Sequence, residues 1–326
     1  MMAHKRKHPE PTDSSRRKLW VYLAVIAFIV VDVLLIAWAL GSAHVEGAGK
    51  SPNAIPTFSA AYPDDAPTPT ATATAPAAPT IVPVVPSRIL SAYSATTAWR
   101  AVTGACPATK ASPEVTRDSA ATWKSTDVTG ATKVVALQRI LASGKDLASM
   151  VGLSGADCSP QLVRTFVGGD DYEVYESDLA GTWFANPATP TSLHGPSGDV
   201  PAPCTIISLA PTDAKSAAVL CADETVRVSA DAGATWALLS PITGAITLTA
   251  AGGGYLVAVA GNEGYAGVQL VSLTTKLAAS QAGCYAMTVP AESLPGNVAL
   301  SSADSTLWLW AGDSVVRSSD AGATWH

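Results

Sequence analysis

The larger part of this sequence, from about residue 80 to residue 326, lacks any sustained amphipathic helical pattern. It also lacks a CxxC pair, and its few histidines are scattered, so the chain has no cysteine and histidine spacing typical of zinc. We therefore expect neither a helical domain nor a bound metal or other cofactor. Short runs of apolar and β-branched residues are present instead, and they predict β-strands and an all-β fold.

An eight-residue stretch, here called the octet, recurs through this region. Two copies are almost identical, SADAGATW at 229–236 and SSDAGATW at 318–325. Two weaker copies, TRDSAATW at 116–123 and ESDLAGTW at 176–183, keep the Asp, Thr and Trp but lack Gly at the fifth position. A repeat of this kind indicates an architecture built from similar units.

Each octet is expected to form a hairpin turn between antiparallel strands. The Asp side chain accepts hydrogen bonds from backbone N–H groups inside the turn, and the Gly adopts a positive φ without steric cost. Thr and Trp then begin the next strand, with the indole over the turn. The positions expected to build these turns are Thr116, Asp118, Thr122, Trp123, Asp178, Thr182, Trp183, Ser229, Asp231, Gly233, Thr235, Trp236, Ser318, Asp320, Gly322, Thr324 and Trp325.

The pattern S-x-D-x-G-x-T-W resembles the Asp-box, a repeat found in bacterial sialidases, sortilin-type receptors, some endoglucanases and photosystem II assembly factors. In those families the box is a structural turn on the rim of a β-propeller blade, away from the binding face. The resemblance therefore implies a β-propeller at 80–326 whose octets lie outside the functional site.

The spacing of the octets predicts about five blades. The interval between Asp231 and Asp320 is nearly two units long, so a unit without an octet is expected there, with strands at 255–259 and 268–273. Five four-stranded units of roughly 49 residues then fill the region, a usual length for a propeller blade. The last unit lacks an outer strand, which residues 81–85 could supply to close the ring; alternatively they are the end of a linker.

The N-terminal part predicts a single membrane anchor. Residues 1–18 form a basic tail, and residues 19–40 are apolar except for Asp32. A helix of that length spans the roughly 30 Å hydrocarbon core. The preceding basic cluster favours a cytoplasmic N-terminus and an extracytoplasmic propeller. A cleaved signal peptide is the alternative, and Asp32 either contacts a partner helix or is simply tolerated as the protonated acid.

Residues 41–79 predict a disordered Pro/Ala/Thr-rich linker between the anchor and the propeller. The chain carries a net charge of −6, and the tail contains six basic and two acidic residues, so the exported part is strongly acidic. Nucleic acid is therefore not an expected partner. An anionic sugar is also disfavoured, unless a local pocket is positive.

All five cysteines lie in the exported part, where disulfides can form. A turn near residues 211–214 would place Cys204 opposite Cys221 on neighbouring strands. Cys106 and Cys158 follow the second strands of consecutive units and are expected to join two blades. Cys284 is left over. The alternative for each pair is two buried free thiols.

The sequence contains no convincing catalytic set. Sialidases need three arginines, a Tyr/Glu nucleophile pair and an acidic residue, whereas Arg117, Arg227 and Arg317 belong to third strands and rim turns. Glu173 and Tyr175 lie on one strand, where side chains alternate between faces, so they are not expected to form a nucleophile pair. A membrane-anchored glycoside hydrolase remains the alternative.

We therefore expect a non-enzymatic binding or assembly module whose partner is an envelope protein or a saccharide. Loops at 155–169 and 186–203 are the candidate contact loops.

Overall fold

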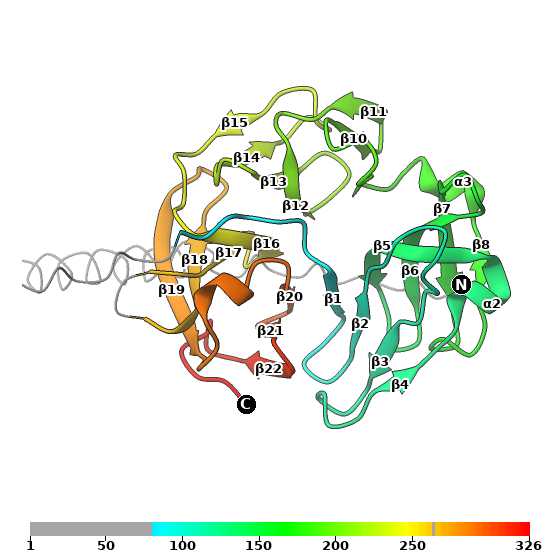
Figure 1. Ribbon diagram of the computed structural model, residues 1–326, viewed down its shortest axis with the longest axis horizontal. Helices are drawn as coiled ribbons and strands as arrows, with labels where there is room; N and C mark the ends of the chain where they lie inside the picture. Colours follow the sequence, from blue (N-terminus) through cyan, green and yellow to red (C-terminus); the bar gives the residue numbers. More distant parts are fainter. Residues whose placement is uncertain (1–79, 263–264) are drawn as a thin grey trace, which may run out of the picture. The chain divides into compact units, whose positions relative to one another are not determined.

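The computed structural model describes residues 80–262 and 265–326, which form six antiparallel sheets arranged as the blades of a β-propeller (Figure 1). Blade 1 contains β1 (Arg88–Ala92), β2 (Ala98–Val102), β3 (Glu114–Thr116) and β4 (Lys124–Ser125). Blade 2 contains β5 (Val134–Ala142), β6 (Ala148–Ser154), β7 (Ser159–Thr165) and β8 (Glu173–Val174), and blade 3 contains β9 (Phe184–Ala185), β10 (Ser192–Gly195) and β11 (Gly198–Pro201).

The C-terminal half supplies three more blades. Blade 4 contains β12 (Ile206–Pro211), β13 (Ala217–Cys221), β14 (Val226–Ser229) and β15 (Ala237–Leu238). Blade 5 contains β16 (Ala245–Ala251), β17 (Gly254–Val259), β18 (Gly267–Leu273) and β19 (Ala279–Ala286), and blade 6 contains β20 (Val298–Ala303), β21 (Thr306–Ala311) and β22 (Ser314–Ser318). The short helices of the described part are α2 (Val128–Thr132), α3 (Glu176–Leu179) and η1 (Ala291–Ser293).

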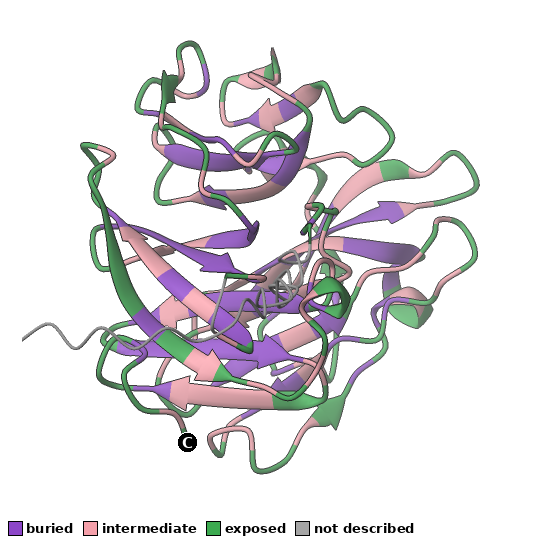
Figure 2. Cartoon of the chain, turned by 60° about the vertical axis from the view of Figure 1, so that its left-hand side comes forward, coloured by how far each residue is buried: buried purple, intermediate pink, exposed green. Residues whose placement is uncertain are grey.

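The core lies between the blades. Every residue of the second strands β13, β17 and β21 is buried, because the adjoining blades cover both faces of these strands (Figure 2). Such strands are rich in Val, Leu, Ala and aromatic residues rather than alternating in polarity. The first strand of each blade touches the first strands of the two neighbouring blades, so the six first strands enclose the centre of the ring.

The prediction of five blades was wrong because blade 3 has almost no strand signal. Its strands are two to four residues long, and they lie in a segment rich in proline and glycine that the sequence suggested was a loop. The blade is nevertheless a paired sheet, with Leu193 opposite Ala185 on one side and Val200 on the other.

The sequence suggested that residues 81–85 supply the outer strand of the last blade. They do not, because they form no strand. Ile81 is instead buried among apolar residues of blades 5 and 6. The backbone of His326 pairs with that of Arg317 at the outer edge of β22, at 2.9 and 3.0 Å. The ring closes where β1 lies beside β20, and the Ala92 N–H donates to Ser301 Oγ at 2.9 Å.

Three octets form the expected turn, with the same bonds in blades 1, 4 and 6. In the octet at 229–236, Ser229 Oγ donates to Asp231 Oδ1 at 2.8 Å, and Asp231 accepts from the N–H of Thr235 at 2.9 Å and from its hydroxyl at 2.6 Å. The equivalent bonds surround Asp118 and Asp320. Hydrogen bonds from Thr122 and from Thr324 lower the pKa of Asp118 and of Asp320, respectively, to about 2, so both carboxylates are ionised.

The copy at 176–183 is not such a turn. Its Asp178 lies in helix α3, and the side chain pairs with Arg164 Nη1 at 2.5 Å instead of holding the backbone. Thr182 Oγ1 donates to the carbonyl of Asp178 rather than to its carboxylate. Trp183 reaches blade 4, where its Nε1 donates to Asp213 O at 2.9 Å. The prediction of a turn-building role for Asp178, Thr182 and Trp183 is therefore wrong.

The true counterpart in blade 2 is the turn at 165–172, TFVGGDDY, which the sequence did not reveal. Thr165 Oγ1 accepts from the N–H of Val167 at 3.3 Å and of Gly169 at 2.8 Å. Ser229 Oγ makes the same two bonds in blade 4, at 3.3 and 2.9 Å. Gly169 and Gly233 both have φ of +87°. Val167 therefore occupies the position of the octet Asp.

Two disulfides join the pairs of cysteines expected from the sequence. Cys106–Cys158 links the loop after β2 in blade 1 to the turn before β7 in blade 2. Cys204–Cys221 links the entry of β12 to the end of β13. Cys284 is free and exposed.

The basic tail, the membrane anchor with Asp32, and the linker at 41–79 lie outside the described residues. Among those that the structure describes, no helix is both long and apolar enough to cross a membrane.

The octets predict a matched pair of stability changes. Ala120 occupies the position of Gly233 and has a φ of +70°, which is strained for a residue with a Cβ. Ala120→Gly should therefore stabilise the protein by up to about 1 kcal/mol in urea unfolding. Gly233→Ala should destabilise it by about 1–2 kcal/mol, because Gly233 has a φ of +87°, which is strained for alanine. The new Cβ would also lie 3.0 Å from the Val200 side chain. An Ala120→Gly variant less stable than wild type would contradict this account.

Candidate functional site: the central channel

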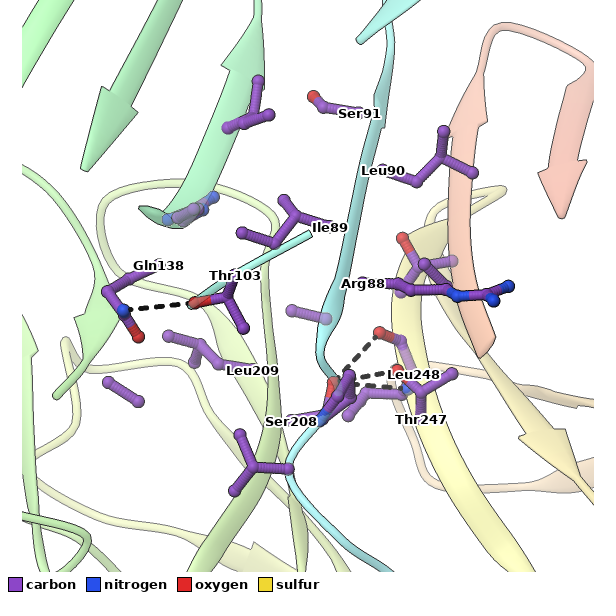
Figure 3. A pocket seen from close by; sticks show the side chains of 18 of the residues that line it. Arg88, Ile89, Leu90, Ser91, Thr103, Gln138, Ser208, Leu209, Thr247 and Leu248 are labelled. Atoms are coloured by element: carbon purple, nitrogen blue, oxygen red, sulfur yellow. Dashed lines mark hydrogen bonds between the residues drawn. The ribbon is translucent and has the colours of Figure 1, made fainter. Parts of the chain in front are cut away.

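The first strands enclose a channel of about 490 Å³ lined by residues from all six blades. Figure 3 shows part of this lining, with labelled residues of blades 1, 2, 4 and 5. Its wall is mostly aliphatic, with Ile89, Leu209 and Leu248 among the lining side chains. Polar groups between them include Gln138, whose Nε2 donates to Thr103 Oγ1 at 3.4 Å. A cavity that combines apolar walls with a few polar side chains is typical of a ligand site.

Serine hydroxyls fix the wall of the channel by bonding from one blade to the next. Ser301 of β20 accepts from the N–H of Ala92, and Ser91 of β1 accepts from the N–H of Ala142 in β5, both at 2.9 Å. Ser208 of β12 lies 3.2 Å from Thr247 Oγ1 of β16 (Figure 3). These bonds hold neighbouring first strands in register, so the channel is preformed.

The charged side chains of the described channel lining are arginines only, Arg88 and Arg139; no Asp, Glu, His, Tyr or Lys side chain is present in that lining. Arg88 points from β1 toward blade 6 (Figure 3), where its guanidinium lies 4.7 Å from the Trp310 ring and Nη1 donates to Gly312 O. Burial lowers the pKa of Arg88, and nearby Asp313 opposes that shift. The charge of Arg88 is therefore partly balanced within blade 6.

Arg139 has no such compensation. It belongs to β5, and its Nη1 donates to the carbonyl of Trp183, just before β9, at 2.6 Å. The other N–H groups of its guanidinium make no hydrogen bond, and the side chain makes no ion pair, with any residue that the structure describes. Burial lowers the pKa of Arg139 to about 10, which leaves it cationic at neutral pH. A cation with unbonded donors is therefore among the residues that line the channel.

The residues singled out for catalysis lie elsewhere. Glu173 and Tyr175 do meet, since Tyr175 Oη donates to Glu173 Oε2 at 3.1 Å, contrary to our expectation. Positions 173 and 175 are two residues apart, and side chains two apart in an extended segment share one face; Tyr175 directly follows β8. They lie at the outer edge of blade 2, not among the channel-lining residues. Partial burial and then the bond to Glu173 raise the pKa of Tyr175, so its hydroxyl stays protonated.

The structure confirms some of the other predicted positions and corrects the rest. Arg227 and Arg317 lie in the third strands β14 and β22, as expected, and Arg117 directly follows β3. The candidate contact loops contain strands, because 159–165 is β7 and 186–203 contains β10 and β11. Of these segments, Asn186, Pro187 and Pro190 reach the channel. No cluster of three His, Cys, Asp or Glu side chains that could hold a metal occurs among residues 80–262 and 265–326.

Sequence reasoning missed the channel arginine. A signal was present, since Gln138 and Arg139 interrupt an apolar run from 134 to 142 that is otherwise typical of a buried strand. A polar pair inside such a run indicates either a bulge or a functional group. The structure shows the bulge, because the pairing of β5 with β6 shifts between Leu137 and Arg139.

Arg139 predicts a stability test. Arg139→Met should leave the ligand-free protein about as stable as wild type, because the change removes a partly buried charge that has one protein acceptor and leaves no partner charge behind. The lost bond to Trp183 should cost no more than about 1 kcal/mol. Arg100→Met is the matched control and should destabilise the protein, since Arg100 pairs with Glu114 at 2.7 Å and stacks on Trp123. Urea unfolding measures both; a large loss for Arg139→Met would show a purely structural role.

The sequence matches no protein-family model and no curated protein. Solved structures with some similarity include YCF48 bound to a D1 peptide, with 14% identity over 76% of this chain and 82% of that chain and a TM-score of 0.38. The lectin of Aleuria aurantia has 10% identity over 76% and 96%, with a TM-score of 0.43. The GH74 xyloglucanase of Xanthomonas campestris has 15% identity over 73% and 37%, with a TM-score of 0.29.

Proposed function

We propose that the propeller is a non-catalytic binding module whose ligand enters the central channel with an anionic group directed at Arg139. The observation that carries this proposal is the unpaired guanidinium in a preformed channel that has no carboxylate in its described lining. An anion that accepts the free N–H groups would compensate the buried charge. A carboxylate-bearing saccharide or the carboxylate of an envelope protein would fit this chemistry.

A glycoside hydrolase is the second candidate because Tyr175 and Glu173 are in contact. Hydrolysis of a glycosidic bond generally requires two carboxylates on opposite sides of the bond, in a cleft that holds the sugar. Glu173 is exposed on an edge strand. The pKa of its partner, Tyr175, is raised, so the Tyr175 hydroxyl stays protonated. The channel lining, as far as the structure describes it, offers no carboxylate. Binding is therefore the better supported function.

The test measures binding and turnover on the same protein. The purified full-length chain is heated with matched probes: glucuronic acid against glucose, and a peptide with a free C-terminal carboxylate against its amide. A probe at 100 times its Kd should stabilise the protein by about 2.7 kcal/mol, and only the carboxylate member of each pair should do so. Arg139→Met should abolish the shift, whereas Arg227→Met, a charge removed outside the channel, should retain it.

Fluorogenic sialosides and β-glucosides form the second arm of this test. We expect no turnover by wild type. Turnover that disappears in Glu173→Gln or Tyr175→Phe would replace the binding proposal with the hydrolase. Equal shifts with the carboxylate and neutral probes, or shifts that survive Arg139→Met, would exclude anion recognition in the channel.

We also propose that the propeller is extracytoplasmic and held at the membrane by residues 19–40. The apolar run, the basic residues before it and the presence of two disulfides support this arrangement. Protease added to intact cells should remove the propeller and leave a membrane-bound stub. A propeller that survives on intact cells but is cleaved in inverted vesicles would contradict the orientation.

A further inference from the structure

The outer edge of blade 2 carries an exposed apolar cluster that the channel does not use. Phe166 is 53% exposed, Val167 49% and Val174 39%. The ring of Tyr175 lies 6.0 Å from the ring of Phe166. The Arg164 guanidinium lies 4.8 Å from the same Tyr175 ring. We call Phe166, Val167, Val174 and Tyr175 the blade 2 patch.

The fold does not require these side chains. Val167 occupies the octet position that holds Asp231 in blade 4 and Asp320 in blade 6, yet Thr165 still closes the turn. Phe166 corresponds to the small residue Ser319 in the blade 6 octet. Blade 2 therefore keeps the turn but replaces its polar tip with two exposed apolar side chains. Contiguous exposed apolar residues with a polar rim are typical of an interaction surface.

The rim of the patch is acidic. Its five carboxylates are Asp170, Asp171, Glu173, Glu176 and Asp178. Two of them have a cationic partner, Asp178 with Arg164 and Asp170 with Lys124. The other three, Asp171, Glu173 and Glu176, form no ion pair with any described residue. The unpaired charge of the segment that carries the patch is therefore negative, and one of its carboxylates, Glu173, bonds the Tyr175 hydroxyl.

We propose that the blade 2 patch docks a basic peptide segment of a partner protein, in which lysine or arginine residues flank an apolar side chain. The apolar side chain would pack on the exposed surface of the Phe166–Tyr175 aromatic pair, and the basic residues would reach the unpaired carboxylates. Strand β8 is the outermost of its sheet, so an extended segment can lie beside it. A second copy of this chain is disfavoured as occupant, because the chain itself is acidic, with a net charge of −6. The proposal is independent of ligand binding in the channel.

The test begins with a library of random twelve-residue peptides displayed on phage and selected on the purified full-length chain, captured through its N-terminus. The enriched peptides should share basic residues around an apolar one. The strongest is synthesised and its affinity measured by fluorescence anisotropy. Phe166→Ser should weaken binding by about tenfold or more, as expected for an aromatic hot spot. Asp171→Asn/Glu176→Gln should also weaken it, and should reduce its sensitivity to salt.

Leu238→Ser is the matched control, since Leu238 is 56% exposed on the outer strand of blade 4. It should leave peptide affinity unchanged. Phe166→Ser should unfold like wild type, because the octet of blade 6 has Ser319 at this position. The proposal is overturned if no consensus is enriched, if the consensus is acidic or uncharged, or if Phe166→Ser binds the peptide as wild type does. A dimer in analytical ultracentrifugation that Phe166→Ser abolishes would assign the patch to self-association instead.

Discussion

Closure of the ring between blade 1 and blade 6 is the constraint on which the rest of the structure depends. Each blade is built from one continuous segment, so no strand is shared across this junction. One backbone bond crosses it, from the Ser87 N–H to Gly296 O at 2.9 Å, and side chains supply other contacts. Trp308 Nε1 donates to Ser94 O at 3.0 Å, and Arg317 Nη1 to Ala95 O at 2.9 Å. The Arg100 guanidinium lies 4.1 Å from the Trp123 ring and 5.1 Å from that of Trp310. Without this seam the first strands would not enclose a channel.

The sequence predicted the all-β propeller because its octets recur, and because a turn built on Asp, Thr and Gly depends on local bonds that adjacent residues supply. It failed where the turn is made without its characteristic residues. Thr165 and Gly169 close the blade 2 turn with Val167 in place of Asp, whereas Asp178 is followed by the expected Thr and Trp but joins a helix. The sequence also did not predict blade 3. Its short strands have little β-propensity of their own and are stabilised by pairing with each other.

The channel could not be predicted, because it exists only when six separate strands meet. Arg139 is distant in sequence from most of the residues that surround it, including Leu209 and Leu248. Its pattern within β5 could mark it as unusual but could not place it. Once it is placed, the observation is physical: a cation with one protein acceptor lines an enclosure without a described acid, and the proposed anionic ligand rests on this observation.

Two surfaces of different chemistry follow from this arrangement, a cationic channel and an acidic aromatic edge on blade 2. The central claim, that the channel attracts anions through Arg139, is tested most directly with bromide. Crystals of wild type and of Arg139→Met are soaked in dilute sodium bromide, and the anomalous scattering locates the bound ions. The account predicts a peak inside the channel, against the Arg139 guanidinium, that is absent in the variant. Bromide bound only at the outer surface in wild type, or a channel peak that persists in Arg139→Met, would contradict it.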